Sequence, residues 1–135
     1  MTNNVKHFFR YQFPAILWAI IIYIASSIPA KKLPKIALQI NDKVIHIGIF
    51  FVFGLLVYRA LEPRIPSLTL SWKRLCTAVT VATFYGLTDE LHQGLVPGRT
   101  LDIKDISADA FGALLAALII FLYNRRKNPS RPAHS

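Results

Sequence analysis

Carboxylate and imidazole side chains recur at helical spacing in three separate parts of the chain. The groups are Asp42 with His46, Asp89 with His92 and Gln93, and Asp105 with Asp109. Residues three or four positions apart share one face of a helix. Each group therefore presents an acid on one helix face, in two cases beside a histidine. Such side chains can exchange protons with a bound substrate as general acids and bases.

The sequence predicts two sets of site residues. The candidate catalytic residues are Asp42, His46, Asp89, Glu90, His92 and Asp109. The candidate substrate-binding residues are Lys43, Gln93, Arg99 and Asp105. Arg99 follows a Pro-Gly turn, and its guanidinium can pair with several of these carboxylates or hold an anionic group through two parallel hydrogen bonds.

A metal cofactor is left open at this stage. Carboxylate and imidazole ligands suit Mn²⁺ or Zn²⁺, so a divalent metal is a possible cofactor. No HExxH run or comparable ligand signature occurs in the chain, and no metal ligands are therefore assigned.

Simpler interpretations compete for several of these residues. Asp42 or Asp102 can act as a helix N-cap, and Lys43 can flank a membrane span. His46 can be a hydrogen-bonded core histidine, and Glu90 can be solvated because it points away from Asp89 around the helix. The whole cluster can equally be a structural polar network.

The elements that carry these residues are long apolar blocks. The chain has 135 residues, of which 53% are hydrophobic and 17% are charged, below the roughly 25% charged share of soluble domains. The blocks cover residues 11–28, 44–61, 75–91 and 106–123, each close to the about 20 residues that cross a bilayer. We expect an all-α polytopic membrane protein, a four-transmembrane-helix bundle over 11–123, between an N-terminal segment, 1–10, and a basic flexible tail, 124–135.

Composition excludes several classes of protein. The single cysteine, Cys76, allows no intrachain disulfide and is expected to be a packed small hydrophobe. The net charge of +9 comes from bases that flank the blocks, which indicates lipid headgroups rather than nucleic acid as partners. The first block could also be a cleaved signal peptide, but three further apolar blocks favour a retained span.

The distribution of charge predicts an orientation. Four spans place ten Lys and Arg residues on the side of the termini and six on the other side. The positive-inside rule then predicts cytoplasmic termini in the cytoplasmic (inner) membrane. Six of the seven acids fall at or near the opposite, outward side.

The acids are expected to face the interior of the bundle. Ionisable groups at membrane depth cost roughly 2.5 to 3.5 kcal/mol each, so lipid-facing positions disfavour them. Small residues continue both acidic stripes, which lets helix backbones approach closely. These small residues are Ala78, Ala82 and Gly86 before Asp89, and Gly112 and Ala116 after Asp109.

Two runs carry a family resemblance. DKVIHIGIFFVFGLL (Asp42–Leu56) and TDELHQGLVPGRTLDIKDISADAFGALL (Thr88–Leu115) resemble the VanZ-like family of bacterial membrane proteins. The matching positions are Asp42, Lys43, His46, Asp89, Glu90, His92, Gln93, Arg99, Asp105 and Asp109, and Ser26, Ser27 and Pro29 match the end of the first span. The stretch TLDIKD departs from the family pattern, so Asp102 and Asp105 compete for the position of the family's acid.

The resemblance covers about residues 20–120 and implies a four-helix membrane domain linked to the cell envelope. The name-giving member is linked to resistance to the glycopeptide teicoplanin. No reaction is implied by the resemblance.

Three functions are compatible with the sequence. The first is an enzyme that acts on a lipid or lipid-linked envelope substrate through the outward Asp/Glu/His/Arg cluster. The second is a non-enzymatic envelope or glycopeptide-resistance factor that uses the same cluster for binding or scaffolding. The third, a proton or ion pathway, would need a homo-oligomer, because four short spans leave little room for a conduit.

Overall fold

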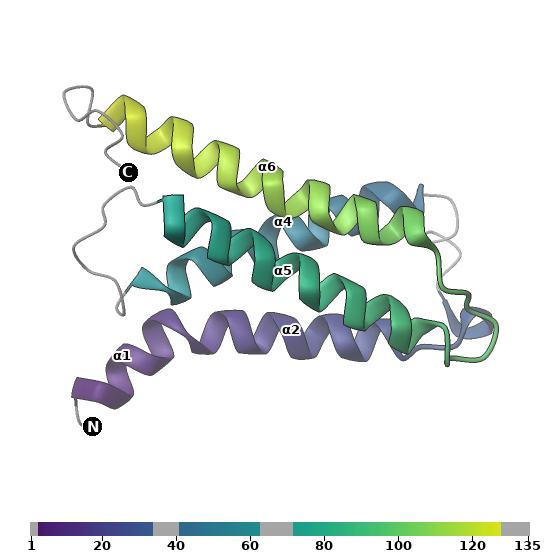
Figure 1. Ribbon diagram of the computed structural model, residues 1–135. Coiled ribbons are helices and arrows are strands. Elements are labelled where there is room, and N and C mark those ends of the chain that lie inside the picture. The colour runs from purple at the N-terminus through teal and green to yellow at the C-terminus, as the bar shows by residue number, and fades with distance from the viewer. Residues whose placement is uncertain (1–2, 34–40, 63–71, 128–135) are drawn as a thin grey trace.

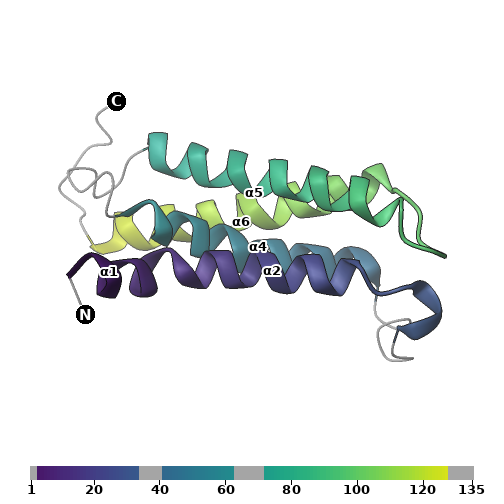
Figure 2. The same ribbon diagram turned by 90° about the horizontal axis from the view of Figure 1, so that it is seen from below.

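The computed structural model describes residues 3–33, 41–62 and 72–127, and all secondary structure in these ranges is helical. The elements are α1 (Asn3–Tyr11), α2 (Phe13–Ser26), the short 3₁₀ helix η1 (Ala30–Lys32), α4 (Asp42–Ala60), α5 (Trp72–Gln93) and α6 (Ile103–Lys127). The long helices lie side by side and alternate in direction along the chain (Figures 1 and 2). The predicted all-α class is confirmed.

One end of this bundle collects four helix termini. α2 and α5 end there, α4 and α6 begin there, and η1 and the α5–α6 loop lie over them (Figure 1). We call this the site end, because nearly all the predicted site residues lie near it. α1 begins and α6 ends at the opposite end.

The predicted first block, 11–28, contains one helix, α2. Residues 3–10 of the predicted N-terminal segment belong to α1, which is bent by 44° from α2 at the break between them. Pro14 lies in the first turn of α2. A proline has no N–H to donate to the preceding turn and its ring crowds that turn, which explains why the helix breaks here.

Membrane-crossing helices are identified by length and composition alone. Among the described residues, α4 and α6 are long and apolar enough to cross a membrane, and the bent pair α1–α2 becomes a third span if it is counted as one. The helices also exceed the predicted blocks: α4, α5 and α6 extend past 44–61, 75–91 and 106–123 at most of their ends. The first residues of the predicted tail, 124–127, belong to α6, and 128–135 lie outside the described residues.

Helix caps correct one expectation and support another. Asn41, not Asp42, caps α4, and its side-chain oxygen accepts a hydrogen bond from the Lys43 backbone N–H at 3.0 Å. Asp102 caps α6, because its Oδ1 accepts from the Lys104 backbone N–H at 2.9 Å. The Asp42 side chain is therefore free of a capping role.

The bundle buries small and polar residues beside a core that includes Phe50 and Phe53, and it exposes many other large apolar side chains. Its most intimate contact is between α4 and α6, where Gly54 packs against Ala113 and Ala116. Large side chains such as Ile24 and Phe111 face outward. That distribution suits a lipid solvent, in which helices associate through close packing and internal hydrogen bonds.

Cys76 departs from its prediction, because it is exposed on α5 rather than packed inside the bundle. Leu75 and Ala78, its neighbours on α5, take the interior positions.

Candidate functional site

A cavity of about 690 Å³ lies at the site end. Apolar side chains from α2 and α4, among them Ile22, Ile49 and Phe50, form part of its wall. Six of the predicted site residues also line it: Asp42, His46, Asp89, Gln93, Arg99 and Asp105. The cavity therefore joins an apolar wall to a charged one.

His46 forms the buried centre of the charged wall. Its Nδ1 lies 2.7 Å from Oδ1 of Asp109, which is fully buried. On the other side of the ring, Nε2 lies 3.9 Å from Oε1 of Glu90 and 4.0 Å from Oδ2 of Asp105. The imidazole of His46, on α4, thus lies close to acids from both α5 and α6.

Glu90 and Asp109 lie behind the cavity wall and do not line it. Both are fully buried, so the interpretation of Glu90 as a solvated side chain is wrong. Glu90 Oε2 accepts the Asp102 backbone N–H at 3.1 Å. The carboxylate of Asp109 packs on Gly86, where a Cβ atom would lie 2.6 Å from Oδ2. The glycine is required because α5 and the Asp109 side chain approach so closely.

A second set of hydrogen bonds runs from Asp89 to Arg99. Gln93 Nε2 donates to Asp89 Oδ2 at 2.9 Å, and Gln93 Oε1 accepts from Arg99 Nη1 at 2.9 Å. Arg99 also donates to the Ile28 and Ala25 carbonyl oxygens, at 3.1 Å and 3.4 Å. Arg99 is therefore oriented by neutral acceptors, and it has no carboxylate partner among the described residues.

Lys43 joins the beginnings of α4 and α6. Its Nζ donates to Asp102 Oδ2 at 2.8 Å and also to Asp105 Oδ1. The Lys43 hydrogen bond, helped by the Lys104 backbone N–H, lowers the pKa of the Asp102 carboxyl, which lies before α6. Asp102 is thus an anionic anchor for Lys43 at neutral pH.

His92 lies apart from the other predicted site residues. Its Nε2 is 2.9 Å from Ser27 Oγ, and its ring stacks on Tyr23 with centroids 4.7 Å apart. Ser27 donates its own hydroxyl hydrogen to the Tyr23 carbonyl oxygen at 2.6 Å, so His92 donates and Ser27 accepts. His92 therefore ties α5 to α2 and does not line the cavity.

The end of α2 contributes to the site, although none of its residues was among the predicted site residues. Ser26 lines the cavity and is buried, and backbone carbonyls of Ala25 and Ile28 hold Arg99. Backbone acceptors leave no trace in residue types, so only the small polar pair Ser26-Ser27 at the end of an apolar block could have indicated this role.

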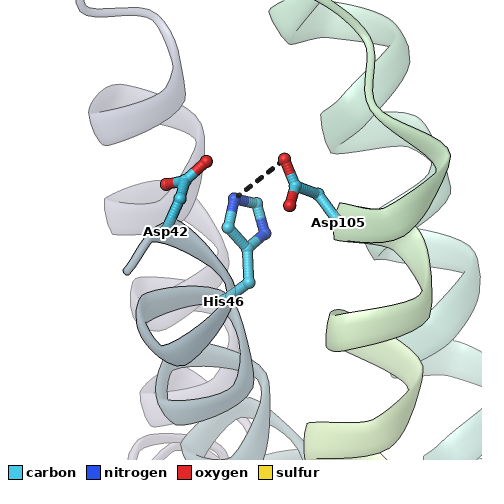
Figure 3. A group of neighbouring side chains, drawn as sticks. All are labelled: Asp42, His46 and Asp105. Atoms are coloured by element: carbon cyan, nitrogen blue, oxygen red, sulfur yellow. Dashed lines mark ion pairs between the residues drawn. The ribbon is translucent and has the colours of Figure 1, made fainter. Parts of the chain in front are cut away.

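Three side chains of the charged wall, two carboxylates and one imidazole, could together hold a metal ion. Ligand atoms of Asp42, His46 and Asp105 all lie within 4.8 Å of one another. Figure 3 shows the two carboxylates on either side of the imidazole.

Comparisons with known proteins agree with the resemblance. The model of the VanZ/LLP1 family matches residues 7–124. The chain is 34% identical over 96 residues to the uncharacterised protein C11E3.10 of the fission yeast Schizosaccharomyces pombe. That match covers 70% of this chain but only 55% of the yeast protein. No solved structure matches. Because the family model covers most of the sequence, the chain belongs to the VanZ/LLP1 family.

Proposed function

We propose that this protein is a multi-pass protein of the cytoplasmic membrane with four spans, α1–α2, α4, α5 and α6, and with both termini in the cytoplasm. α5 lies alongside the two helices that pass the span criteria (Figure 1), and charged residues occur only near its ends. The basic residues concentrate on the side of the termini. The site end then lies at the outer membrane face.

The topology predicts the side on which two engineered cysteines react. In a variant with Cys76→Ser, we expect a cysteine at Lys104, an exposed residue at the site end, to react in intact cells with a membrane-impermeant maleimide. A cysteine at Lys127, at the far end of α6, should react only after the cells are opened. Labelling of both positions in intact cells, or of neither, would reject four spans in this orientation.

We propose further that the cavity is the active site of an enzyme that acts on a lipid or lipid-linked substrate with an anionic, phosphate-bearing head. The observation that carries this proposal is Arg99, a cavity-lining guanidinium held by neutral acceptors. Arg74 at the opposite end offers a contrast, since it donates to the Glu62 carboxylate at 3.0 Å. Arg99 keeps its charge available for a ligand, and phosphate is a preferred partner of arginine.

The apolar wall supports a lipid as the substrate. The cavity opens at the end of the bundle, where the proposed topology places lipid headgroups, and α2 and α4 line it with isoleucines. A headgroup can meet Arg99 while the acyl chains continue along the apolar helices. The yeast relative favours a head shared by bacterial and fungal membranes over one restricted to bacterial walls.

Proton transfer would fall to the residues that face the cavity. His46 presents Nε2 toward it and is oriented through Nδ1 by Asp109, so it has the arrangement of a general base positioned by a carboxylate. Asp89 lines the cavity beside it. Asp109 and Glu90 act through His46 as positioning residues, whereas His92 is expected to hold α5 against α2.

The proposal predicts the lipid content of complemented cells. In a host that lacks the protein, wild type should restore the levels of phosphate-bearing lipids, measured by mass spectrometry. Arg99→Ala should lower product at least about tenfold, because a charge-assisted hydrogen bond contributes about 1.5–3 kcal/mol. Asp89→Asn should fail as well, since it keeps the acceptor for Gln93 but loses the charge.

Two comparisons make this experiment decisive. Lys104→Ala removes an exposed positive charge from the same end of the bundle but not from the cavity wall, and should complement fully. All variants must reach the membrane at wild-type abundance. Full complementation by Asp89→Asn with failure of Arg99→Ala would favour the binding or scaffolding role instead. Complementation by both variants would show that the function does not need the cavity.

A further inference from the structure

We infer that Asp42, His46 and Asp105 form a binding site for a divalent cation. The inference goes beyond the proposed function, because it concerns the cation alone and stands without any lipid substrate. With the cation bound, His46 Nε2 is a ligand, and Asp89 rather than His46 would transfer the proton. The three ligand atoms come from the first turns of α4 and α6 and lie within 4.8 Å of one another. Figure 3 shows the Asp42 and Asp105 carboxylates flanking the imidazole, one on each side.

The hydrogen bond of His46 prepares its other nitrogen for a cation. Where Asp109 is ionised it can only accept, and Nδ1 then carries the hydrogen that bridges 2.7 Å to Asp109. In a neutral imidazole, Nε2 then holds a bare lone pair. A histidine whose second nitrogen donates to a carboxylate is the usual arrangement of metal-ligating histidines.

The surroundings of Nε2 point to a missing positive charge. Its nearest carboxylate oxygens, on Glu90 and Asp105, are 3.9 Å and 4.0 Å away, beyond the roughly 2.7–3.2 Å of a hydrogen bond. Glu90 is fully buried, and its Oε1 has no hydrogen-bond partner within the part of the chain that the structure describes. A hydrogen on Nε2 would find no acceptor in range. A cation among these atoms would satisfy both oxygens and the nitrogen.

The charge around the cavity is unbalanced in the same direction. The acids that line the cavity are Asp42, Asp89, Asp102 and Asp105, and Arg99 is the one Lys or Arg residue among its described lining residues. Lys43 pairs with Asp102 and with Oδ1 of Asp105, while Arg99 meets only neutral acceptors. Lys43 thus leaves Oδ2 of Asp105, the oxygen that faces His46, without a hydrogen-bond partner among the described residues. Uncompensated carboxylates are costly away from water, so a divalent cation would stabilise this end.

The donor set limits which cation fits. Two carboxylates and one imidazole suit Mn²⁺ or Zn²⁺. Metal–ligand distances of about 2.0–2.2 Å place neighbouring ligand atoms about 3.4 Å apart. The 4.0 Å between His46 Nε2 and Asp105 Oδ2 must then shorten by roughly half an ångström, which rotation of the carboxylate can supply. Asp42 is exposed and can turn to complete the set.

Direct Mn²⁺ binding tests the inference. Purified, untagged, chelator-treated protein in detergent is titrated with Mn²⁺, and the free ion is followed by electron paramagnetic resonance. We expect one saturable site per chain, with a ¹⁴N coupling on the bound Mn²⁺ that reports the His46 imidazole. Asp42→Asn should raise the Kd at least tenfold. The Asp42 side chain has no hydrogen bond or ion pair among the described residues, so this variant should fold normally.

Asp102→Asn is the matched control. It removes the same charge from the same end of the bundle, but Asp102 lies outside the three ligands and asparagine can still cap α6. Its Kd should stay within threefold of wild type. Absence of saturable Mn²⁺ binding, a bound ion without ¹⁴N coupling, or equal weakening by the two variants would overturn the site. None of these outcomes involves lipid, so the cation site can fail while the proposed function stands.

Discussion

His46→Ala is expected to lower the free energy of unfolding by about 3–5 kcal/mol, the range for leaving a buried charge without compensation. Asp109 is fully buried, and Oδ1 has His46 as its partner at 2.7 Å. Its other oxygen, Oδ2, has no hydrogen-bond partner among the described residues. Removal of the imidazole would therefore leave a carboxylate inside the bundle with neither charge nor hydrogen-bond compensation.

The measurement is chemical or thermal unfolding of the purified protein in one detergent. His92→Ala is the matched control, because it also removes a histidine from the site end but leaves no buried carboxylate stranded; it breaks the hydrogen bond to Ser27 and the stacking on Tyr23. Its cost should be smaller, at about 0.5–1.5 kcal/mol for each contact. A double variant, His46→Leu with Asp109→Leu, should recover most of the loss, since replacing both partners removes the stranded charge. Equal losses in His46→Ala and His92→Ala would contradict the buried pair.

The contrast between these two histidines shows where sequence reasoning stops. Helical spacing placed Asp89 beside both His92 and Gln93, and the structure keeps only Gln93 in the cavity wall. At about 100° per residue, His92 lies about 60° to one side of Asp89 around the helix and Gln93 about 40° to the other side. Which side faces the cavity depends on where α2 packs, and the residues of α5 alone carry no information about that.

Packing also determines how deeply each acid lies within the bundle. The small-residue stripes indicated the contact faces, and helical spacing placed Asp105 and Asp109 on one face of the last helix. Spacing could not distinguish Asp105, which lines the cavity, from Asp109, which lies behind it. The two differ by one helical turn, and the tilt between α4 and α6 decides which one reaches the cavity.

Two local features were signalled by a single residue type, but neither was predicted correctly. Pro14 lies inside the first apolar block, and its missing N–H accounts for the bend between α1 and α2. The capping residue of α4 was misassigned by one position, because Asn41 and Asp42 are both good N-caps and the sequence does not say where helical backbone begins.

The second large effect is expected from Gly112→Ala, which should cost about 1–3 kcal/mol of stability through overpacking. A Cβ atom at Gly112 would overlap the Ile47 carbonyl oxygen and lie 2.9 Å from the Phe51 backbone nitrogen. Both are backbone atoms of α4, so no side-chain rotation can make room. The helices α4 and α6 would have to move apart.

That movement would reach the site, because the two helices carry its central pair. Ile47 directly follows His46, and Gly112 lies one turn after Asp109. Gly112→Ala should therefore weaken complementation and Mn²⁺ binding as well as stability, although it touches no polar group. A purely local cost would appear in stability alone.

Gly48→Ala provides the control for the methyl group itself. Gly48 also lies on α4, and a Cβ atom there would meet nothing within 4 Å. Because alanine favours a helix over glycine by about 0.8–1 kcal/mol, this variant should be neutral or slightly more stable. If Gly112→Ala unfolded at the same denaturant concentration as Gly48→Ala and kept full Mn²⁺ affinity, α4 and α6 could not be in the close contact that brings His46 to Asp105 and Asp109. The proposed cation site and the cavity both depend on that contact.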